Sequence, residues 1–409
     1  MNANHRNALV AIGLLGWTQP ASADVITDWN QKAVALVQPR MPPPQGHRAT
    51  AMIHLAMFDA VNSIERRYRP YLVQVTAAPT TSKEAAAAAA ATAVLTGLLP
   101  QVRDEVRAVL ATYLDAIPDG KAKTDGIELG EAVAAKILEA RVNDGSGAPD
   151  NYRPRTTPGV YVPTALTVAP MWANLRPFTM TNPSQFRPAP PLKLDSSQWV
   201  TDFNEIKEVG SKSSSKRTAK QTEDARFWLI TGPQAYDPIA RQLVAAKSMD
   251  SVDAARFMAL TSVATADALI AVLDAKYHYE FWRPITAIRN GDLQNNASIK
   301  RDPTWQPIDN TPMHPEYPCA HCIVAASFAA VIEGLLGTDV PEISATSPTA
   351  PGITHQWTNM QAFVNEVSEA RIWAGFHYRF STKVGQDMGY KIGGHVVKNF
   401  MQPATMATR

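Results

Sequence analysis

The sequence has few cysteines, almost no net charge and no long apolar run beyond its first residues, and each absence excludes a class of protein. Two cysteines among 409 residues exclude a scaffold held together by several disulfides. The 39 Lys and Arg nearly balance the 37 Asp and Glu, so no global charge recruits nucleic acid or an anionic membrane. If the protein binds an anion, the positive charge must therefore come from a local cluster of residues.

The N-terminus has the layout of an export signal. Arg6 supplies positive charge, residues 8–17 are apolar, and residues 21–23 (Ala-Ser-Ala) form a small-x-small cleavage pattern. A short buried helix is the alternative. The pattern predicts a signal peptide over residues 1–23, a mature chain that begins near Asp24, and a periplasmic or secreted location. No later stretch approaches the roughly 18 uninterrupted apolar residues of a spanning helix, so no membrane span is expected in the mature chain.

Helical periodicity dominates wherever the remaining chain is apolar. Apolar residues recur at three- and four-residue spacing over residues 50–67, and the alanine run 85–91 is a strong helix former. No segment alternates convincingly as a strand. The pattern predicts an all-α fold with helices over residues 50–67, from 84 onward, and over 102–117, 126–142, 199–209, 218–229, 254–276, 323–336, 360–376 and 383–400.

A proline-rich segment interrupts the helices. Residues 153–193 contain nine prolines, which prevent long helices, but also aromatic side chains such as Trp172 and Phe178. Disordered tracts are poor in aromatics, so an ordered segment that wraps around the helices is favoured over a disordered linker.

Lys276 and Arg283 form the first candidate element of a site. They are seven positions apart, which is two turns, so both project to one side if the helix continues to Pro284. Such a pair is usually part of a solvated face. Here the neighbours Tyr277 and Trp282 suggest partial burial, and buried cations require an anion.

The second element is the stretch from His314 to Cys322. Pro318 suits a turn or the entry to a helix, which would place the backbone N–H groups of Cys319, Ala320 and His321 at a helix N-terminus. Unpaired N–H groups and the helix dipole favour an oxyanion there. His321 is expected at the rim of that site.

Arg371 and His377 form the third element. The Arg371 guanidinium offers a two-pronged donor for an oxyanion, and a His377 ring nitrogen can attack phosphorus or coordinate a metal. A lone histidine is more often structural than catalytic. The presence of three such elements in order favours a catalytic role for His377 over a structural one.

Together the three elements resemble the signature of the superfamily that contains vanadium haloperoxidases and type 2 phosphatidic acid phosphatases. That signature reads Lys-x6-Arg-Pro, Pro-Ser-Gly-His and Ser-Arg-x5-His-x3-Asp, and its counterparts here are residues 276–284, 318–321 and 370–381. Further similarity, from about Thr50 onward, is to soluble bacterial relatives of vanadium chloroperoxidase. The resemblance implies one all-helical domain over residues 24–409, built from helical bundles.

The resemblance also implies a pocket for a tetrahedral oxyanion, either vanadate or phosphate. The groups expected to hold it are three cations and two backbone amides: Lys276, Arg283, Arg371, Cys319 and Ala320. In a haloperoxidase, His377 would bind the vanadium and His321 would act as acid and base, with peroxide and a halide as small-molecule partners. In an acid phosphatase, His377 would attack the phosphorus of a phosphate ester and His321 would protonate the leaving alcohol. A homo-oligomer is left open.

Four positions depart from the family pattern. Cys319, Ala320, Ala370 and Ser381 stand where the family has Ser, Gly, Ser and Asp. Ser381 cannot supply the negative charge that would orient His377. A free Cys319 thiolate would compete with the oxyanion for positive charge, whereas a disulfide with Cys322, three residues on in an oxidising compartment, would remove it. We treat that disulfide as a hypothesis.

Three other classes of protein fit part of the sequence. A thiol-disulfide oxidoreductase would use Cys-x-x-Cys at a helix start, although the alternating strands of such folds are missing. A zinc site would use Cys319, Cys322 and two of His314, His321 and His377. A non-catalytic phosphate-binding protein would use the same cations without turnover.

Overall fold

The computed structural model describes residues 24–404, apart from residues 164 and 295. The signal peptide expected over residues 1–23 lies outside the described residues, so it stays a prediction, as does the single domain over 24–409. The described chain is mostly helical with one two-stranded sheet, which confirms the predicted all-α class. One large hydrophobic core runs from the first helix to the last.

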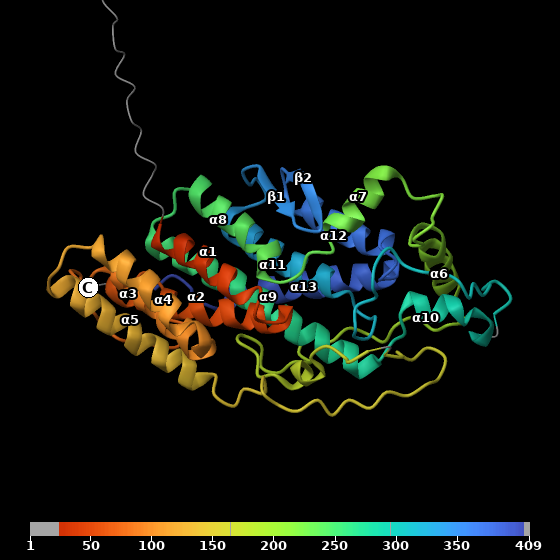
Figure 1. The fold of residues 1–409 in the computed structure, drawn as a ribbon, viewed down its shortest axis with the longest axis horizontal. Coiled ribbons are helices and arrows are strands. Elements are labelled where there is room, and N and C mark those ends of the chain that lie inside the picture. The colour runs from red at the N-terminus through yellow and green to blue at the C-terminus, as the bar shows by residue number, and fades with distance from the viewer. Residues whose placement is uncertain (1–23, 164, 295, 405–409) are drawn as a thin grey trace, which may run out of the picture.

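The N-terminal helices pack together at one end of the molecule (Figure 1). They are α1 (Val25–Val37), α2 (Pro43–Glu65), α3 (Lys83–Leu98), α4 (Arg103–Asp115) and α5 (Lys121–Ala140). The alanine run of α3 is fully buried, because small side chains let α5 approach closely. A Cβ on Gly130 of α5 would lie 2.3 Å from the Ala86 carbonyl oxygen, so only glycine permits this spacing.

The C-terminal helices pack around the long helix α9 (Ser251–Tyr279) or, in the case of α12, on the helices α11 and α13 that contact it, and α9 also contacts α2. They are α8 (Asp237–Ala246), α11 (Ala320–Leu336), α12 (Met360–Trp373) and α13 (Arg379–Asn399). Glycines at four-residue spacing line the face of α13 that meets α11, and a Cβ on Gly389 would lie 2.4 Å from the Ile323 carbonyl oxygen. This close packing fixes the start of α11 against the start of α13, where two of the three predicted site elements lie.

Shorter elements complete the described chain. They are α6 (Ser197–Val209), α7 (Ala219–Phe227), α10 (Pro284–Arg289) and the 3-10 turns η1 (Pro100–Val102), η2 (Pro170–Asn174), η3 (Pro233–Ala235) and η4 (Gly291–Gln294). Each predicted helix is present with its ends moved by a few residues. The sequence analysis did not predict α1, α8 or α10.

A β-hairpin corrects the expectation that no strand would form. Strand β1 (Ile343–Ser347) pairs antiparallel with β2 (Ala350–Trp357), with Ile343 opposite Trp357. Only a few side chains of β2 are buried, among them His355 and Trp357, and the intervening residues are polar or exposed. The strands therefore lack the regular apolar alternation that sequence patterns detect.

The proline-rich segment is ordered, as predicted, and runs along one edge of the molecule (Figure 1). The buried Asp267 carboxylate on α9 accepts the backbone N–H groups of Phe178 and Thr179, each at 2.7 Å. Trp172 is buried in the core. A carboxylate that accepts neighbouring N–H groups holds an irregular backbone in place where no helix or sheet can.

Among the described residues, α9 is long and apolar enough by composition to cross a membrane, with a mean hydropathy of 1.6. However, 94% of that window is buried inside the molecule. A helix that is apolar on all sides and surrounded by other helices is typical of the centre of a large core.

Candidate active site

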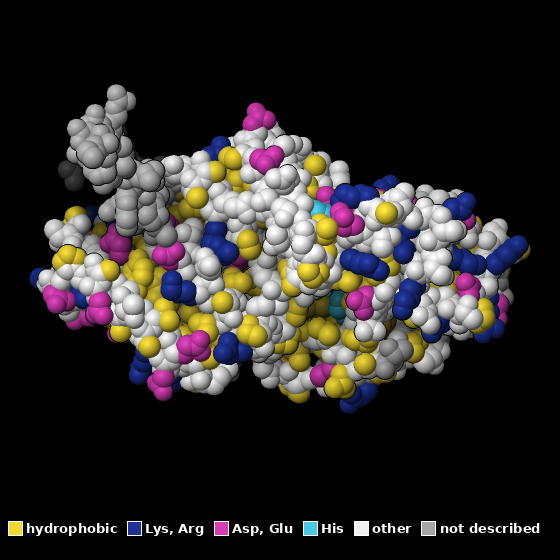
Figure 2. All heavy atoms as spheres, turned by 45° about the horizontal axis from the view of Figure 1, so that its top comes forward, with side chains coloured by type: hydrophobic (Ala, Val, Ile, Leu, Met, Phe, Trp, Pro, Cys, Tyr) yellow, Lys and Arg dark blue, Asp and Glu magenta, His cyan; other side chains and the backbone are white. Residues whose placement is uncertain are grey.

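The second and third predicted elements line one pocket, and Arg283 of the first element contacts His314 and His377 there. A cavity of about 230 Å³ is lined by His314, Ala320, His321, Arg371 and His377, together with residues of two neighbouring loops. The space-filling view shows a hollow near the middle of one face, with a histidine at its floor (Figure 2). Lys276 and Arg283 lie behind this pocket and are almost fully buried.

Lys276 and Arg283 do not share a helix, which corrects the sequence analysis. Helix α9 ends at Tyr279, Glu280 adopts a left-handed conformation (φ 49°), and Arg283 caps the start of α10. The two cations come together because both hold the loop before α11. Lys276 Nζ donates to the carbonyl oxygens of Pro315 and Glu316, each at 2.8 Å, and Arg283 Nε donates to that of His314 at 2.9 Å.

Arg283 also reaches the third element. Its Nη1 donates to the Phe376 carbonyl oxygen at 2.9 Å and lies 3.2 Å from His377 Nε2. Burial lowers the pKa of Arg283 to about 10, although the Glu316 carboxylate opposes this. Burial, and then the charge of Arg283, lowers the pKa of Lys276 well below its usual value. The cations therefore destabilise each other unless an anion binds between them.

The start of α11 provides backbone donors, but not all of those expected. The Cys319 N–H already donates to the Ser381 carbonyl oxygen at 3.3 Å, and the Cys322 N–H donates to Cys319 Sγ at 3.2 Å. Within the described part of the chain, the N–H groups of Ala320 and His321 have no acceptor. The amides left for an oxyanion are thus those of Ala320 and His321, and the donor role expected of the Cys319 amide passes to His321.

Cys319 and Cys322 form a disulfide, as hypothesised, with their Cα atoms 5.3 Å apart. Both residues are fully buried. No thiolate then competes for the positive charge of the site, and neither sulfur is available as a zinc ligand. A disulfide without exposed sulfur also weakens the alternative of a thiol-disulfide oxidoreductase, because exchange needs access to a sulfur atom.

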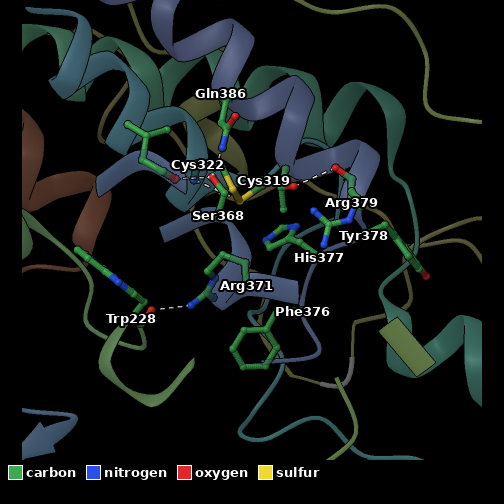
Figure 3. Close-up of a disulfide and its surroundings, with 12 residues drawn as sticks. Trp228, Cys319, Cys322, Ser368, Arg371, Phe376, His377, Tyr378, Arg379 and Gln386 are labelled. Carbon is green, nitrogen blue, oxygen red and sulfur yellow. Dashed lines mark hydrogen bonds between the residues drawn. A yellow bond between two sulfur atoms is a disulfide. The ribbon is translucent and has the colours of Figure 1, made fainter. Parts of the chain in front are cut away.

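Arg371 points toward the pocket beside His377, below the disulfide (Figure 3). Its Nη1 donates to the Trp228 carbonyl oxygen at 2.6 Å, and its guanidinium lies 4.8 Å from the centre of the Phe376 ring. Its Nε is buried and has no hydrogen-bond partner among the described residues. Burial, and then Arg283, lowers the pKa of Arg371 to about 9. An unpaired buried guanidinium N–H is a site for an oxyanion oxygen.

His377 is held in one tautomer. Its Nδ1 lies 2.8 Å from Glu316 Oε1, so Nδ1 carries the proton, and the lone pair of Nε2 accepts a hydrogen bond from Arg283 Nη1 at 3.2 Å. Burial, followed by the charge of Arg283, lowers the pKa of His377 well below its usual value, which keeps the ring neutral. The Nε2 of a neutral imidazole can act as a nucleophile or as a metal ligand when Arg283 Nη1 donates to a bound anion instead.

Glu316 is the site residue that the sequence analysis missed. It is fully buried, and its Oε1 also accepts the Tyr378 N–H at 3.1 Å. Burial raises the pKa of Glu316 to about 7, although Lys276 and Arg283 oppose the shift. The negative charge that Ser381 cannot supply therefore comes from the loop before α11. The sequence did offer a signal for this role, because Glu316 is a carboxylate that stands among prolines and apolar residues in the second motif.

His321 lies half-buried at the pocket rim, as expected. Its Nε2 lies 3.1 Å from the Ile230 carbonyl oxygen, so a neutral ring donates from Nε2 and keeps its lone pair on Nδ1. Burial, and then Arg371, lowers the pKa of His321 well below its usual value. The ring is therefore neutral, and Nδ1 is its acceptor atom.

The charges of the site do not balance. Three buried cations, Lys276, Arg283 and Arg371, face one buried carboxylate, Glu316. Buried charges need partners, and a multiply charged oxyanion would supply them. The arrangement fits vanadate or phosphate on two further grounds: an unpaired guanidinium N–H, and a neutral histidine nitrogen beside it.

A known family model matches the part of the chain that contains the site. Residues 256–405 match the family model of the VCPO second helical-bundle domain. The match includes all three motifs of the site and confirms the predicted resemblance to the vanadium chloroperoxidase branch of the superfamily.

Individual relatives share the fold at low identity. Vanadium chloroperoxidase from Curvularia inaequalis is 25% identical over an alignment that covers 43% of this chain and 38% of that protein, so the chain matches well under half of its curated relative. A bacterial vanadium-dependent iodoperoxidase structure has a TM-score of 0.78 at 23% identity and covers 94% of this chain and 99% of its own. The holo form of a bacterial vanadium-dependent chloroperoxidase has a TM-score of 0.70 at 18% identity, with 88% and 92% covered.

Proposed function

We propose that this protein is a vanadium-dependent haloperoxidase, which uses peroxide to oxidise a halide at the pocket between α11 and α13. The observation that carries the proposal is His377 Nε2 beside three buried cations that, among the described residues of the site, a single carboxylate offsets. The relatives named above are described as vanadium chloroperoxidase and iodoperoxidase. Vanadate, when bound, would supply the Lewis-acidic centre that activates peroxide toward the halide.

The residues of the chain would divide the work. Arg371 Nε and the amides of Ala320 and His321 bind the oxygens of the anion, while Lys276 and Arg283 supply long-range positive charge from behind. These two cations also fix the loop that carries Glu316.

The two histidines would have different tasks. Nε2 of His377 is the ligand atom, and Glu316 holds the proton on the opposite nitrogen. His321 would take a proton from the incoming peroxide and return it later, through Nδ1, because Nε2 donates to the Ile230 carbonyl oxygen and leaves Nδ1 as the acceptor.

Halide oxidation by purified protein with vanadate and hydrogen peroxide tests this proposal. We expect activity that depends on added vanadate and falls at least about 100-fold in His377→Ala, because the ligand nitrogen is lost. His395→Ala is the matched control, since His395 lies far along α13 and contacts the Thr179 carbonyl oxygen. Vanadate-saturated protein that oxidises neither iodide nor bromide would refute the proposal.

An acid phosphatase is the second candidate, and the Glu316–His377 pair is the observation that favours it. A histidine with a carboxylate on Nδ1 is a stronger nucleophile at Nε2, which could attack phosphorus. In that reaction His321 would protonate the leaving alcohol, so its ring would have to begin protonated. Hydrolysis of a phosphate ester without vanadate, by the same preparation, separates the two enzymes. Phosphate binding without either turnover would indicate a binding protein.

We also propose that the protein is exported to the periplasm or the cell exterior. The disulfide supports this location, because disulfides persist in oxidising compartments. Mass spectrometry of protein from the expressing cell should find a chain that begins near Asp24. A chain from the periplasm or medium that retains residues 1–23 would contradict the cleavage, and protein confined to the cytoplasm would contradict export.

A further inference from the structure

A second cluster of ionisable side chains lies where α7 and β2 meet over α12 (Figure 1). It consists of Glu223 and Asp224 on α7 and His355 on β2. One possible ligand atom from each residue lies within 4.8 Å of the other two. None of the three residues lines the oxyanion pocket. Two carboxylates and one imidazole together form a donor set that suits divalent transition metals.

The ring of His355 is fixed with one nitrogen toward this cluster. The side chain is 4% exposed, and the ring stacks on that of Phe227 with the centroids 3.9 Å apart. Nδ1 lies 2.6 Å from Glu366 Oε1, so Nδ1 donates to that carboxylate and Nε2 faces the carboxylates of α7. Histidines that bind metals typically donate their second ring N–H to a carboxylate in this way.

Glu366 orients this histidine from a fixed position. Its Oε1 also accepts the Trp228 Nε1–H, and its Oε2 accepts the Trp357 Nε1–H, each at 2.9 Å. Because both oxygens already accept hydrogen bonds, Glu366 is held in place beside His355. It is therefore a positioning residue, which determines the nitrogen of His355 that is available to a metal.

The distances around His355 Nε2 suit a tetrahedral metal ion. Nε2 lies 3.4 Å from Glu223 Oε1 and 3.6 Å from Asp224 Oδ1. Zinc bonds of about 2.0–2.2 Å place the ligand atoms of a tetrahedron about 3.3–3.6 Å apart. The Glu223 side chain is 36% exposed, so water can reach a fourth ligand position. Calcium fits less well, because it prefers more ligands and oxygen alone.

A positive charge already lies among the three ligand atoms. Lys220 Nζ contacts Asp224 Oδ1. It also lies 3.1 Å from Glu223 Oε1 and 3.4 Å from His355 Nε2. The Lys220 side chain is 62% exposed, so the ammonium can move into solvent. Among the described side chains in contact here, this single ammonium faces three carboxylates, Glu366 included, and a divalent ion would offset more of that negative charge.

We propose that Glu223, Asp224 and His355 bind a zinc ion, which displaces the ammonium of Lys220 and joins α7 to β2. The ion has three protein ligands and one water. Because two of the ligands come from a helix and the third from the hairpin, the bound ion stabilises the contact between them. The site is independent of the proposed haloperoxidase function, since the groups that hold the oxyanion belong to a different pocket.

Calorimetric titration of metal-free mature protein with Zn²⁺, in buffer without phosphate or vanadate, is the first test. We expect a saturable site that is at least about tenfold weaker in His355→Gln, because the imidazole ligand is lost. The histidines of the oxyanion pocket are intact in this variant, so zinc bound by them would not change. His395→Gln is the matched control, since His395 on α13 contacts the Thr179 carbonyl oxygen. Wild type that binds no zinc, or His355→Gln that binds it as tightly as wild type, would overturn the proposal.

Lys220→Gln separates a metal site from a network of ion pairs. In a metal site the ammonium competes with zinc, so this variant should bind zinc at least about fivefold more tightly than wild type. Lys216→Gln removes an exposed charge from the preceding loop and should bind zinc as wild type does. Absence of zinc binding in both wild type and Lys220→Gln would show an ion-pair network only. Unchanged or weaker binding in Lys220→Gln would overturn the displacement of the ammonium.

Thermal unfolding and cobalt absorption are the third test. Zinc should raise the unfolding temperature of wild type, because it binds the folded chain, and should leave that of Asp224→Asn unchanged. This second variant keeps the size of the side chain but loses the charged ligand. Co²⁺ in place of zinc should give wild type the visible absorption of a tetrahedral site, and Asp224→Asn should lack it. A zinc effect of equal size in both proteins, or octahedral cobalt absorption in wild type, would overturn the proposed ligand set.

Discussion

At the scale of single residues, the site depends on where its one carboxylate comes from. The family pattern places an Asp four positions after the histidine, but Ser381 stands there in this chain. Glu316, from a loop 61 residues earlier in the sequence than His377, contacts Nδ1 instead. A negative charge thus reaches His377 from a different element, which no linear motif could reveal.

Glu316→Gln should change the preference of the site between two similar oxyanions. The substitution keeps the side-chain volume but removes the charge that fixes His377. Vanadate, which would bond to Nε2, should bind about 10- to 100-fold more weakly. Phosphate binds without a covalent or coordinate bond to Nε2. The variant should therefore bind phosphate as tightly as wild type or more tightly, because it lacks the buried negative charge of Glu316.

Titration of the purified protein with each anion measures this ratio. Glu333→Gln on α11 is a control, since Glu333 is half-buried and outside the pocket. An unchanged ratio of vanadate to phosphate affinity would show that Glu316 does not position His377. Equal weakening for both anions would indicate general damage to the pocket.

At the scale of elements, the contact between α11 and α13 sets the geometry of the pocket. Gly389 lies where a Cβ would come within 2.4 Å of the Ile323 carbonyl oxygen and 2.6 Å of the Ala326 Cβ. The Ile323 carbonyl group belongs to the backbone of α11, so it cannot move aside as a flexible side chain can. Any larger residue there must separate the two helices, and the amides of Ala320 and His321 lie at the start of one of them.

Gly389→Ala should therefore destabilise the protein, by about 1–3 kcal/mol, although alanine is the better helix former. Gly394→Ala is a matched control on the same helix, because nothing lies within 4 Å of its added Cβ. That variant should be stabilised by up to about 1 kcal/mol. Denaturant unfolding of both variants measures the difference, and equal effects would contradict the close packing.

The helices and strands also show which structural features can be predicted from sequence patterns. Helices such as α2 and α9 were predicted because their sequences hold long stretches of apolar, helix-forming residues. The break at Glu280 was not, since it depends on an isolated bridge between Phe281 and Val160, more than a hundred residues away. The hairpin of β1 and β2 was missed because only some of its side chains are buried.

At the scale of the whole molecule, buried polar groups join segments that are far apart in the sequence. Asn30 Nδ2 of α1 donates to His54 Nε2 of α2 at 2.8 Å and to Asp237 Oδ2 of α8 at 2.7 Å. Asp267 of α9 holds the proline-rich segment in the same manner. The three site motifs were recognisable because their chemistry is local, whereas these long-range contacts have no local pattern.

The Asn30–His54 contact predicts how stability depends on pH. His54 is fully buried, and burial, with Arg241, lowers its pKa from 6.5 to about 3. Above pH 6.5 the ring is neutral in both the folded and unfolded chain and carries no penalty. As the pH falls from 6.5 toward 3, only the unfolded chain takes up the proton, so stability is lost.

His54→Gln should remove this dependence, because a Gln oxygen can accept from Asn30 at the place of Nε2 but does not titrate. Below pH 6.5, the free energy of unfolding of wild type should fall more steeply than that of the variant, by about 1.4 kcal/mol per pH unit. Asp237, whose pKa burial raises to about 6, is present in both proteins, so the comparison isolates the histidine. Urea unfolding at pH 7, 6 and 5 measures the two slopes. Parallel slopes would mean that His54 takes up its proton in the folded protein, and that the contact between α1 and α2 opens to water.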